Sequence, residues 1–289
     1  MGVLVNLCRL LPVALLFGLA GCAPLLTTLT PGPAAVTRGV AFDPDTGLQL
    51  DVYAPPRAKD APVVVFFYGG RWQDGTRRHY GFIGKALASR GVVVMVPDYR
   101  VYPTVRFPAF LDDCARAVVW AHEHAAQFGG DAGKLVLMGH SAGAYNAAML
   151  ALDADLLAKA GGSRQWLRGM IGFGGPYDFL PITDPILRQV FGPTEQWPGT
   201  QPVNFASAGA PPLLLLHGAD DTTVRPRNSE SLAAQVNAQG GTATSVLFPD
   251  LGHVWPLVAL AGPLRWRANA LDQVDAFVRQ VTAAPEHGG

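Results

Sequence analysis

One stretch of sequence constrains the fold of this chain more than any other. "LVLMGHSAGAYNAAML" (135–150) begins as an apolar run and continues in small residues typical of a packed helix. Where the two meet, Ser141 stands between Gly139 and Gly143, which gives the pattern G-x-S-x-G. A sharp turn from strand to helix strains its central residue, and flanking glycines let neighbouring chain pass close. The pattern predicts a strand–turn–helix unit that lifts the serine hydroxyl out at the end of a sheet.

Short apolar runs alternate with helical patterns along the rest of the chain. Apolar runs of this length, rich in β-branched residues, are typical of strands buried on both faces of a parallel sheet. These runs predict strands at 62–68, 91–97, 134–139 and 212–218. An alternating polar and apolar stretch at 47–55 predicts a half-buried strand, and a further strand is predicted at 242–248. The helical patterns predict helices at 80–89, 110–127, 142–152, 229–239 and 264–281. This alternation indicates an α/β fold with a mostly parallel central sheet flanked by helices.

The composition narrows the class of protein. The chain has 289 residues, of which 49% are hydrophobic, as expected for a globular protein with a sizeable core. Its 22 basic and 22 acidic residues give no net charge, so no long-range field favours nucleic acid as a partner. A stretch rich in proline and aromatic residues, 176–212, interrupts the alternation. We expect it to form a short cap over the carboxyl ends of the strands, where substrate pockets form.

The N-terminus is typical of a secretory signal. Arg9 precedes an apolar run from Leu10 to Leu19, which is short for a membrane-spanning helix. The run ends in "LAGC" (19–22), which resembles a bacterial lipobox. The resemblance implies a signal peptide at 1–21, cleavage before Cys22 and acylation of its thiol, which would anchor the protein to the cell envelope. Alanine rather than aspartate at position 23 then favours the outer membrane. The alternative is an ordinary signal peptide with a chance cysteine.

The cysteines leave little room for disulfide or metal chemistry. Besides Cys8 and Cys22 the chain has only Cys114, so the mature protein cannot form an internal disulfide. We expect Cys114 to be a packed small hydrophobe. No metal-ligand spacing occurs, and we expect no metal and no cofactor. The proline- and threonine-rich stretch 22–36 is predicted to be a membrane-proximal tether, and 37–284 to be the catalytic domain.

Ser141 needs a base to become a nucleophile. His253 stands in a turn-rich loop, "PDLGHVW", directly after a predicted strand, and is the candidate base. His217 ends an apolar run, which favours a structural role. The remaining histidines lie on a predicted helix, in a loop, inside the turn or in the tail: His122, His124, His79, His140 and His287.

The base needs a carboxylate, and the transition state needs hydrogen-bond donors. "HGADDTTVRP" (217–226) follows a predicted strand and offers both Asp220 and Asp221. "FFYGGRWQDG" (66–75) follows another strand, and its backbone N–H groups, with that of Ala142, are candidates for an oxyanion hole.

Together these motifs resemble the α/β-hydrolase superfamily. "GGRWQDG", "VPDYRVYP", "FPAFLDD", "LVLMGHSAGAY" and "LLLLHGADDTTV" follow in the order seen in small esterases of the hormone-sensitive-lipase and feruloyl-esterase-like groups. The resemblance covers about residues 40–282. Residues 66–144 are also similar to isoprenylcysteine methylesterases and arylformamidases. The resemblance implies an α/β-hydrolase fold with the catalytic residues in the chain order Ser, Asp, His.

The resemblance also assigns residues that the motifs alone leave open. Many hydrolases of this fold carry His-Gly, two residues, Asp, two residues, Val, and this spacing selects Asp221 over Asp220, with Val224 in register. Alignment with the HGGG-type loop implies that Gly70 and Arg71 supply oxyanion N–H groups.

Two residues depart from the pattern of the family. Tyr68 stands where most relatives have histidine, and Arg71 stands where many have a small residue. We expect the Tyr68 hydroxyl to brace the loop, and Arg71 to reach solvent or, alternatively, to lean into the pocket. Asp98 in "PDYR" and Asp112 and Asp113 in "FPAFLDD" are expected to tie loops together near the site.

The expected function is that of a serine carboxylesterase. Ser141 would form an acyl-enzyme with small to medium acyl or aryl esters, using no metal or cofactor. An amidase or arylformamidase with the same triad is the first alternative. A catalytically inactive binding lipoprotein is the second, which a Ser141 sealed from solvent would favour.

Overall fold

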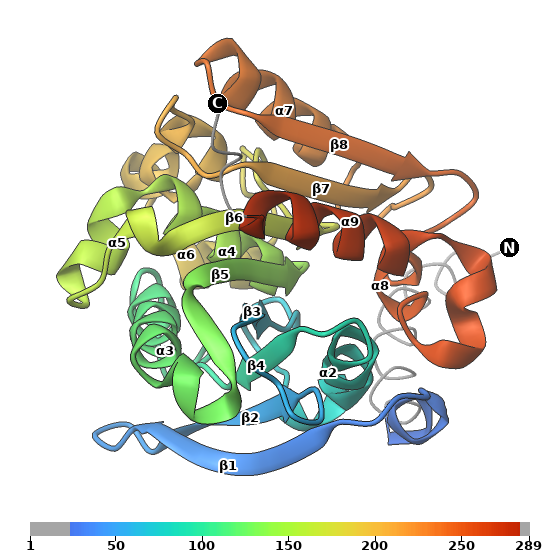
Figure 1. Cartoon of the computed structure of the whole chain (residues 1–289). Helices are drawn as coiled ribbons and strands as arrows, with labels where there is room; N and C mark the ends of the chain where they lie inside the picture. Colours follow the sequence, from blue (N-terminus) through green and yellow to red (C-terminus); the bar gives the residue numbers. More distant parts are fainter. Residues whose placement is uncertain (1–23, 284–289) are drawn as a thin grey trace, which may run out of the picture.

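The computed structural model describes residues 24–283 and shows one eight-stranded sheet, in the order β1-β2-β4-β3-β5-β6-β7-β8 (Figure 1). The first two strands are β1 (Ala35–Asp43) and β2 (Leu48–Ala54), and both pairings of β2 are antiparallel. The other strands all run parallel to one another. They are β3 (Ala61–Phe67), β4 (Val93–Pro97), β5 (Gly130–His140), β6 (Leu167–Phe173), β7 (Leu213–Gly218) and β8 (Ala243–Phe248).

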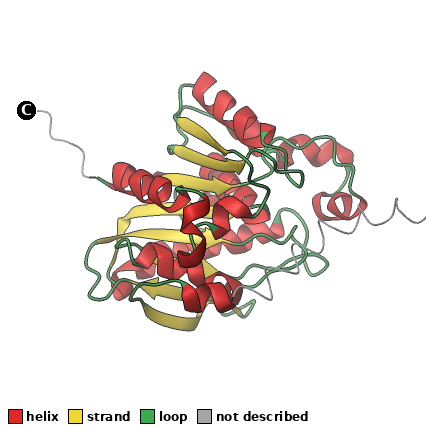
Figure 2. Cartoon of the chain, turned by 90° about the vertical axis from the view of Figure 1, so that its right-hand side faces the viewer, coloured by secondary structure: helices red, strands yellow, loops and turns green. Residues whose placement is uncertain are grey.

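Helices cover both faces of this sheet (Figure 2). The longer ones are α2 (Gly81–Ala88), α3 (Ala109–His124), α4 (Ala142–Leu152), α7 (Arg227–Ala238) and α9 (Ala270–Thr282). Because both faces are covered, every residue from Val63 to Phe67 in β3 is fully buried, as the continuous apolar run predicted. The predicted mostly parallel α/β sheet is therefore confirmed.

Two strands were not predicted, and one predicted helix is divided. β6 carries Gly169 and Gly172 inside it, and glycines weaken a strand pattern, so it was not predicted. β1 was not predicted either, because most of it is exposed at the sheet edge. The helix predicted at 264–281 is two elements, η6 (Gly262–Arg267) and α9, because Ala268 between them is extended.

The segment that was expected to act as a tether packs against the body of the protein. Residues 24–29 are helical, and Thr30 is fully buried. The Thr30 hydroxyl accepts a hydrogen bond from the Gly262 N–H at 3.2 Å, and Lys85 Nζ donates to the Thr27 carbonyl at 2.9 Å. The expected signal peptide at 1–21 and Cys22 lie outside the described residues, as do position 284 and His287.

The stretch 176–212 folds as a small insertion of short helices, α6 (Pro185–Phe191), η4 (Thr194–Thr200) and η5 (Pro202–Phe205). Phe191 at its centre packs edge-on against Trp72, with 4.8 Å between ring centroids, and against Tyr145 at 5.6 Å. Trp72 follows the end of β3, and Tyr145 lies in the first turn of α4. The insertion therefore covers the carboxyl end of the sheet, as predicted. Among residues 24–283, no helix is long and apolar enough to span a membrane.

Candidate active site

Ser141 occupies a strained turn between β5 and α4. Its φ is +54°, a region that non-glycine residues rarely adopt, and its N–H donates to the Phe173 carbonyl at 2.8 Å. The flanking glycines are required by close packing. A Cβ on Gly139 would lie 2.3 Å from the Gly143 carbonyl oxygen, and a Cβ on Gly143 would lie 2.1 Å from that of Phe67. The predicted strand–turn–helix unit is thus present, and it presents the serine at the carboxyl end of the sheet.

The structure brings the three predicted catalytic residues together. His253 Nε2 lies 2.9 Å from Ser141 Oγ, and His253 Nδ1 lies 2.7 Å from Asp221 Oδ2. Asp221 comes from the loop after β7 and His253 from the loop after β8. Ser141 retains 9% of its surface exposed, whereas the Asp221 side chain is fully buried. Solvent can therefore reach the serine while the carboxylate stays shielded.

Asp221 rather than its exposed neighbour Asp220 contacts the histidine. Its Oδ1 accepts the N–H groups of Thr223 and Val224, each at 2.9 Å, which fixes the side chain within its own loop. Burial alone would raise the pKa of Asp221, but hydrogen bonds from His217 and His253 outweigh it and hold that pKa well below its usual range. The carboxylate therefore stays ionised at neutral pH.

His217 takes part in this network, which the sequence did not predict. Its Nε2 faces two acceptors, Asp221 Oδ2 at 3.1 Å and the Val224 carbonyl at 2.9 Å, so this nitrogen carries the proton. Its Nδ1 then accepts from the Ser229 hydroxyl at 2.7 Å. His217 is fully buried, so it has the structural role expected of it and also holds the Asp221 carboxylate.

His140, inside the turn, supports the backbone of His253. Its Nε2 donates to the His253 carbonyl at 3.2 Å. Burial and the neighbouring His253 lower the pKa of His140 to about 3, so its ring is neutral near pH 7. The two histidines are 113 residues apart in sequence, so no local sequence pattern predicts their contact.

The predicted oxyanion loop is a tight turn after β3. Its residues Gly70, Arg71 and Trp72 all have positive φ, and the Gly70 carbonyl accepts the N–H groups of Gln73 at 2.9 Å and Asp74 at 3.1 Å. Trp72 Nε1 donates to Asn146 Oδ1 on α4 at 3.0 Å, which ties this loop to the helix that follows Ser141. Within residues 24–283, the N–H groups of Arg71 and Ala142 donate to no protein acceptor. They remain available for a substrate oxygen.

The two departures from the family pattern have distinct structural roles. The Tyr68 hydroxyl donates to Asp98 Oδ1 at 3.1 Å, which confirms that it braces the loop. Arg71 reaches solvent as expected, because its side chain is 41% exposed. It pairs with Asp184 of the insertion at 2.7 Å. The Asp184 carboxylate also caps the N-terminus of α6.

Buried and half-buried carboxylates tie the neighbouring loops, as expected. Asp98 accepts the Arg77 N–H at 2.8 Å and pairs with the Arg77 guanidinium. Asp113 accepts two hydrogen bonds from the Arg100 side chain, at 2.9 and 2.6 Å. Cys114 is buried, and burial raises the pKa of its thiol, so it is a packed small side chain rather than a nucleophile.

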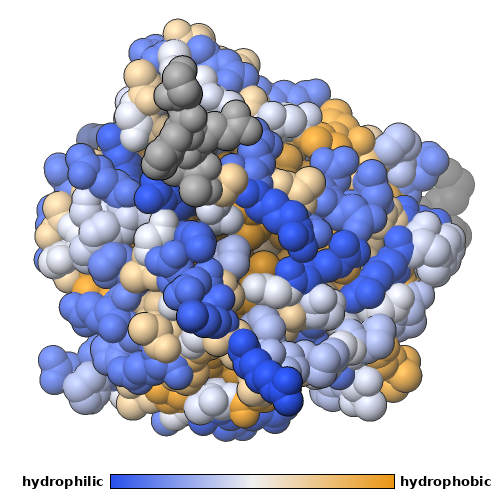
Figure 3. All heavy atoms as spheres, viewed as in Figure 1, coloured by the Kyte–Doolittle hydropathy of each residue, from blue (hydrophilic) through white to orange (hydrophobic). Residues whose placement is uncertain are grey.

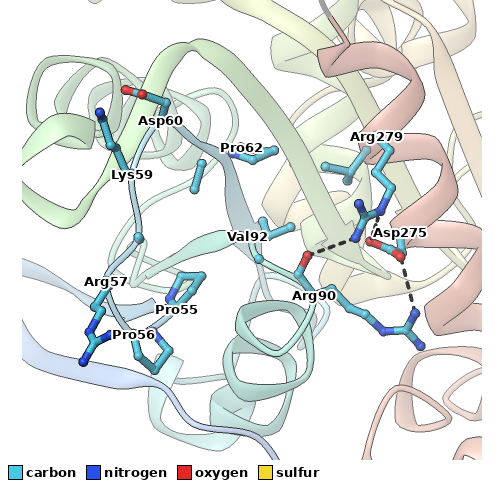
Figure 4. Close-up of a pocket in the computed structure, with 14 residues that line it drawn as sticks. Pro55, Pro56, Arg57, Lys59, Asp60, Pro62, Arg90, Val92, Asp275 and Arg279 are labelled. Atoms are coloured by element: carbon cyan, nitrogen blue, oxygen red, sulfur yellow. Dashed lines mark hydrogen bonds and ion pairs between the residues drawn. The ribbon is translucent and has the colours of Figure 1, made fainter.

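A separate cavity of about 360 Å³ lies at the opposite end of the sheet (Figure 4). Pro62 near the start of β3 and Val92 just before β4 line it, together with Arg279 of α9. It therefore opens at the amino ends of these strands, away from Ser141. Among residues 24–283, no group of three or more His, Cys, Asp or Glu side chains is placed to hold a metal ion.

Comparison with known proteins places this site in a family. A model of the BD-FAE family matches residues 50–236, a range that includes Ser141 and Asp221. The chain belongs to the BD-FAE family. Among solved structures, this BD-FAE chain is similar to esterase 2 of Thermogutta terrifontis, with a TM-score of 0.73 and 27% identity over 89% of this chain and 98% of that one. This likeness confirms the α/β-hydrolase fold. Solved structures of that esterase include a butyrate-bound form and one phosphonylated by sarin.

Curated relatives of this BD-FAE chain are also esterases by name. It is 29% identical to a probable isoprenylcysteine alpha-carbonyl methylesterase of Oryza sativa subsp. japonica, over 80% of this chain and 60% of that protein. It is 29% identical to esterase LipC of Mycobacterium tuberculosis, over 78% of this chain and 62% of that protein. The chain thus spans about three fifths of the length of these relatives.

Proposed function

We propose that this protein is a serine carboxylesterase. The observation that carries the proposal is the continuous hydrogen-bonded path from Ser141 through His253 to the buried Asp221. Such a path activates a hydroxyl that is otherwise a poor nucleophile. The family and the esterase names of its relatives agree with this chemistry.

In the acylation step, Ser141 Oγ attacks the ester carbonyl carbon while His253 Nε2 takes its proton. The carbonyl oxygen becomes an oxyanion, and we propose that the Arg71 and Ala142 N–H groups, with the Gly70 N–H, donate to it. Collapse of this intermediate breaks the bond to the alcohol oxygen, and His253 returns the proton to that oxygen. The ionised Asp221 stabilises the imidazolium in between.

Deacylation repeats these steps with water. His253 Nε2 takes a proton from a water molecule as its oxygen attacks the acyl-enzyme carbonyl. The second intermediate collapses, the bond to Ser141 Oγ breaks, and His253 returns the proton to the serine. The products are the free carboxylic acid and the original enzyme, so the cycle needs no metal or cofactor.

The substrates we propose are small to medium acyl or aryl esters. Aromatic rings from the insertion and the neighbouring helix, including Phe179, Phe191 and Tyr145, pack together above the loop of Trp72. A substrate site built against this apolar cluster would favour acyl or aryl groups over charged ones. The butyrate-bound form of the related esterase 2 is consistent with a short acyl group.

Hydrolysis of p-nitrophenyl acetate and butyrate tests the proposal. The wild-type chain should hydrolyse both, and Ser141→Ala should reduce the rate by about 10³-fold or more while leaving the fold intact. A formanilide assayed beside them tests the amidase alternative, which requires the anilide to be the better substrate. Absence of hydrolysis in a folded wild-type protein would instead support the inactive binding protein, although Ser141 is not sealed from solvent.

We also propose that Cys22 is acylated and anchors the protein to the bacterial cell envelope, at the outer membrane. The support is the apolar run Leu10–Leu19 followed by "LAGC" at 19–22. Several acyl chains hold a protein on a bilayer where one is marginal. Metabolic labelling with an alkyne fatty acid should mark the wild-type chain and not Cys22→Ser. A labelled chain that fractionates with the inner membrane would contradict the proposed sorting.

A further inference from the structure

Two segments far apart in sequence form one exposed apolar face. We call residues 24–29 together with η6 (Gly262–Arg267) the N-terminal face. The segments are in contact, because the Gly262 N–H donates to the Thr30 hydroxyl at 3.2 Å and a Cβ on Gly262 would lie 3.0 Å from the Leu29 carbonyl oxygen. Both lie at the right of Figure 1, where the chain enters the described region.

Large apolar side chains point outward from this face. Within residues 24–283, six large hydrophobic residues are exposed, and three of them are Leu25, Leu29 and Trp266. Trp266 is 76% exposed, the highest fraction of the six, and the two leucines are 57% and 52% exposed. Figure 3 shows apolar side chains at the lower right edge, over the N-terminal helical turn that Figure 1 draws in blue. Exposed apolar side chains that cluster in this way indicate an interaction surface, whereas single exposed apolar residues are common on any protein surface.

The charged residues within these two segments are all basic, and Asp272 of α9 lies near Arg265. Arg265 and Arg267 lie on either side of Trp266, and neither 24–34 nor 255–267 contains an acidic residue. The Arg267 guanidinium lies 5.4 Å from the Trp255 ring centre and 5.2 Å from that of Trp266, so two indoles hold it. Tryptophan and arginine side by side suit the headgroup layer of a bilayer, where indoles reside and phosphates attract cations.

The position of this face in the chain identifies its partner. Residues 1–23 lead directly into it, and they carry the apolar run Leu10–Leu19 and Cys22. Any attachment at Cys22 leaves only Ala23 between the lipid and Pro24. So short a link holds this face against the surface to which the chain is attached.

We infer that the N-terminal face lies on an anionic lipid bilayer. Leu25, Leu29 and Trp266 enter the headgroup layer, and Arg267, whose guanidinium lies over the two indoles, contacts a lipid phosphate. This inference goes beyond ester hydrolysis and rests on the proposed anchor only for the attachment at Cys22. His253 lies two residues before α8 (Trp255–Val258), and three residues link α8 to η6, so the face also holds the catalytic loop close to the membrane.

Fluorescence of Trp266 in vesicles tests this inference. The full chain is reconstituted into vesicles of phosphatidylethanolamine and phosphatidylglycerol, with and without brominated acyl chains. Subtracting the emission of Trp266→Phe isolates the Trp266 signal. We expect this signal to shift to shorter wavelength in vesicles and to be quenched by the brominated lipid. The variant Arg267→Glu should weaken the shift, since one arginine contributes about five-fold to partitioning onto anionic lipid.

A matched pair of leucines controls for general effects of added charge. Leu29→Glu should weaken the quenching of Trp266. Leu247→Glu should not, because this exposed leucine lies on β8 at the other edge of the sheet. Equal loss of quenching in both variants would contradict the inference.

The remaining outcomes separate the inference from the other proposals. A chain that floats with the vesicles while its Trp266 signal stays unquenched overturns the inference and leaves the anchor standing. A chain that does not float overturns both. A Trp266 signal that shifts with protein concentration in the absence of lipid would show that the face binds a second copy of the chain. That result would overturn the inference that its partner is a lipid bilayer. Hydrolysis of p-nitrophenyl butyrate in the same samples reports the proposed esterase independently.

Discussion

His253 Nε2 lies 2.9 Å from Ser141 Oγ, although 112 residues separate the two in sequence. The opposite nitrogen of the same ring lies 2.7 Å from Asp221 Oδ2. Because an ionised carboxylate only accepts, the proton of the neutral ring sits on Nδ1 and leaves Nε2 basic. The ring is therefore in the tautomer that can take the serine proton.

Asp221→Asn should lower kcat by about 10³–10⁴-fold, because an amide favours the wrong tautomer of His253. Steady-state hydrolysis of p-nitrophenyl butyrate measures the effect. The matched control is Asp220→Asn, which changes the exposed neighbouring carboxylate and should leave kcat within about two-fold. Equal losses in the two variants would contradict the assignment of the acid.

Gly70→Ala should disrupt the oxyanion loop. Its Cβ would lie 1.9 Å from the Asp74 carbonyl oxygen, at a φ of +140°. We expect kcat to fall by about 10²–10³-fold, the usual effect of losing an oxyanion donor. Gly91→Ala is the control, because Gly91 also has positive φ but a Cβ there meets nothing within 4 Å. If Gly70→Ala kept full kcat, the loop would have no part in catalysis.

His140 should make stability depend on pH. In the folded protein burial holds its pKa at about 3, whereas an unfolded histidine protonates near pH 6.5. Below about pH 6.5 the unfolded chain therefore binds a proton that the native state refuses, and stability falls by roughly 1.4 kcal/mol per pH unit. This contribution is fully present above pH 6.5 and is lost as the pH falls toward 3.

Urea unfolding at pH 7.5 and pH 5 measures this loss. Between these two pH values the free energy of unfolding of wild type should fall by about 2 kcal/mol more than that of His140→Gln, because the variant lacks the titrating ring. The control is His124→Gln, at a half-buried position outside the site. Its free energy of unfolding should depend on pH as that of wild type does. If the free energy of unfolding fell equally with pH in wild type and His140→Gln, the low pKa of His140 would be refuted.

The ion pair between Arg71 and Asp184 should matter little for catalysis. Both side chains are more than a third exposed, so Arg71→Ala should destabilise the protein by less than about 1 kcal/mol. Because the backbone N–H remains, kcat should change less than about two-fold. Asp184→Ala also removes the helix cap of α6 and should destabilise by about 1–2 kcal/mol in urea unfolding. A ten-fold fall in kcat for Arg71→Ala would show that the guanidinium meets the substrate.

The sequence was most informative where the determinants are local. The turn around Ser141 could be predicted because its glycines are adjacent to it and each is required by a backbone contact. The Asp221 loop is likewise marked by a local spacing, His-Gly, two residues, Asp, two residues, Val. By contrast, the Arg71–Asp184 pair and the bond from His140 to the His253 carbonyl each span 113 residues, and only the assembled sheet brings them together. β6 was not predicted because its glycines interrupt the apolar run, and only pairing with β5 and β7 shows that this segment is a strand.

Covalent labelling of Ser141 is the most direct test of the central claim. A fluorophosphonate reacts with a serine only when a base has activated it. After incubation of the full chain with such a probe, digestion and mass spectrometry should find the phosphonyl adduct on Ser141. The adduct should be absent from Ser141→Ala and formed far more slowly in Asp221→Asn. Ester hydrolysis by wild type without labelling at Ser141, or with the label on another residue, would contradict the account.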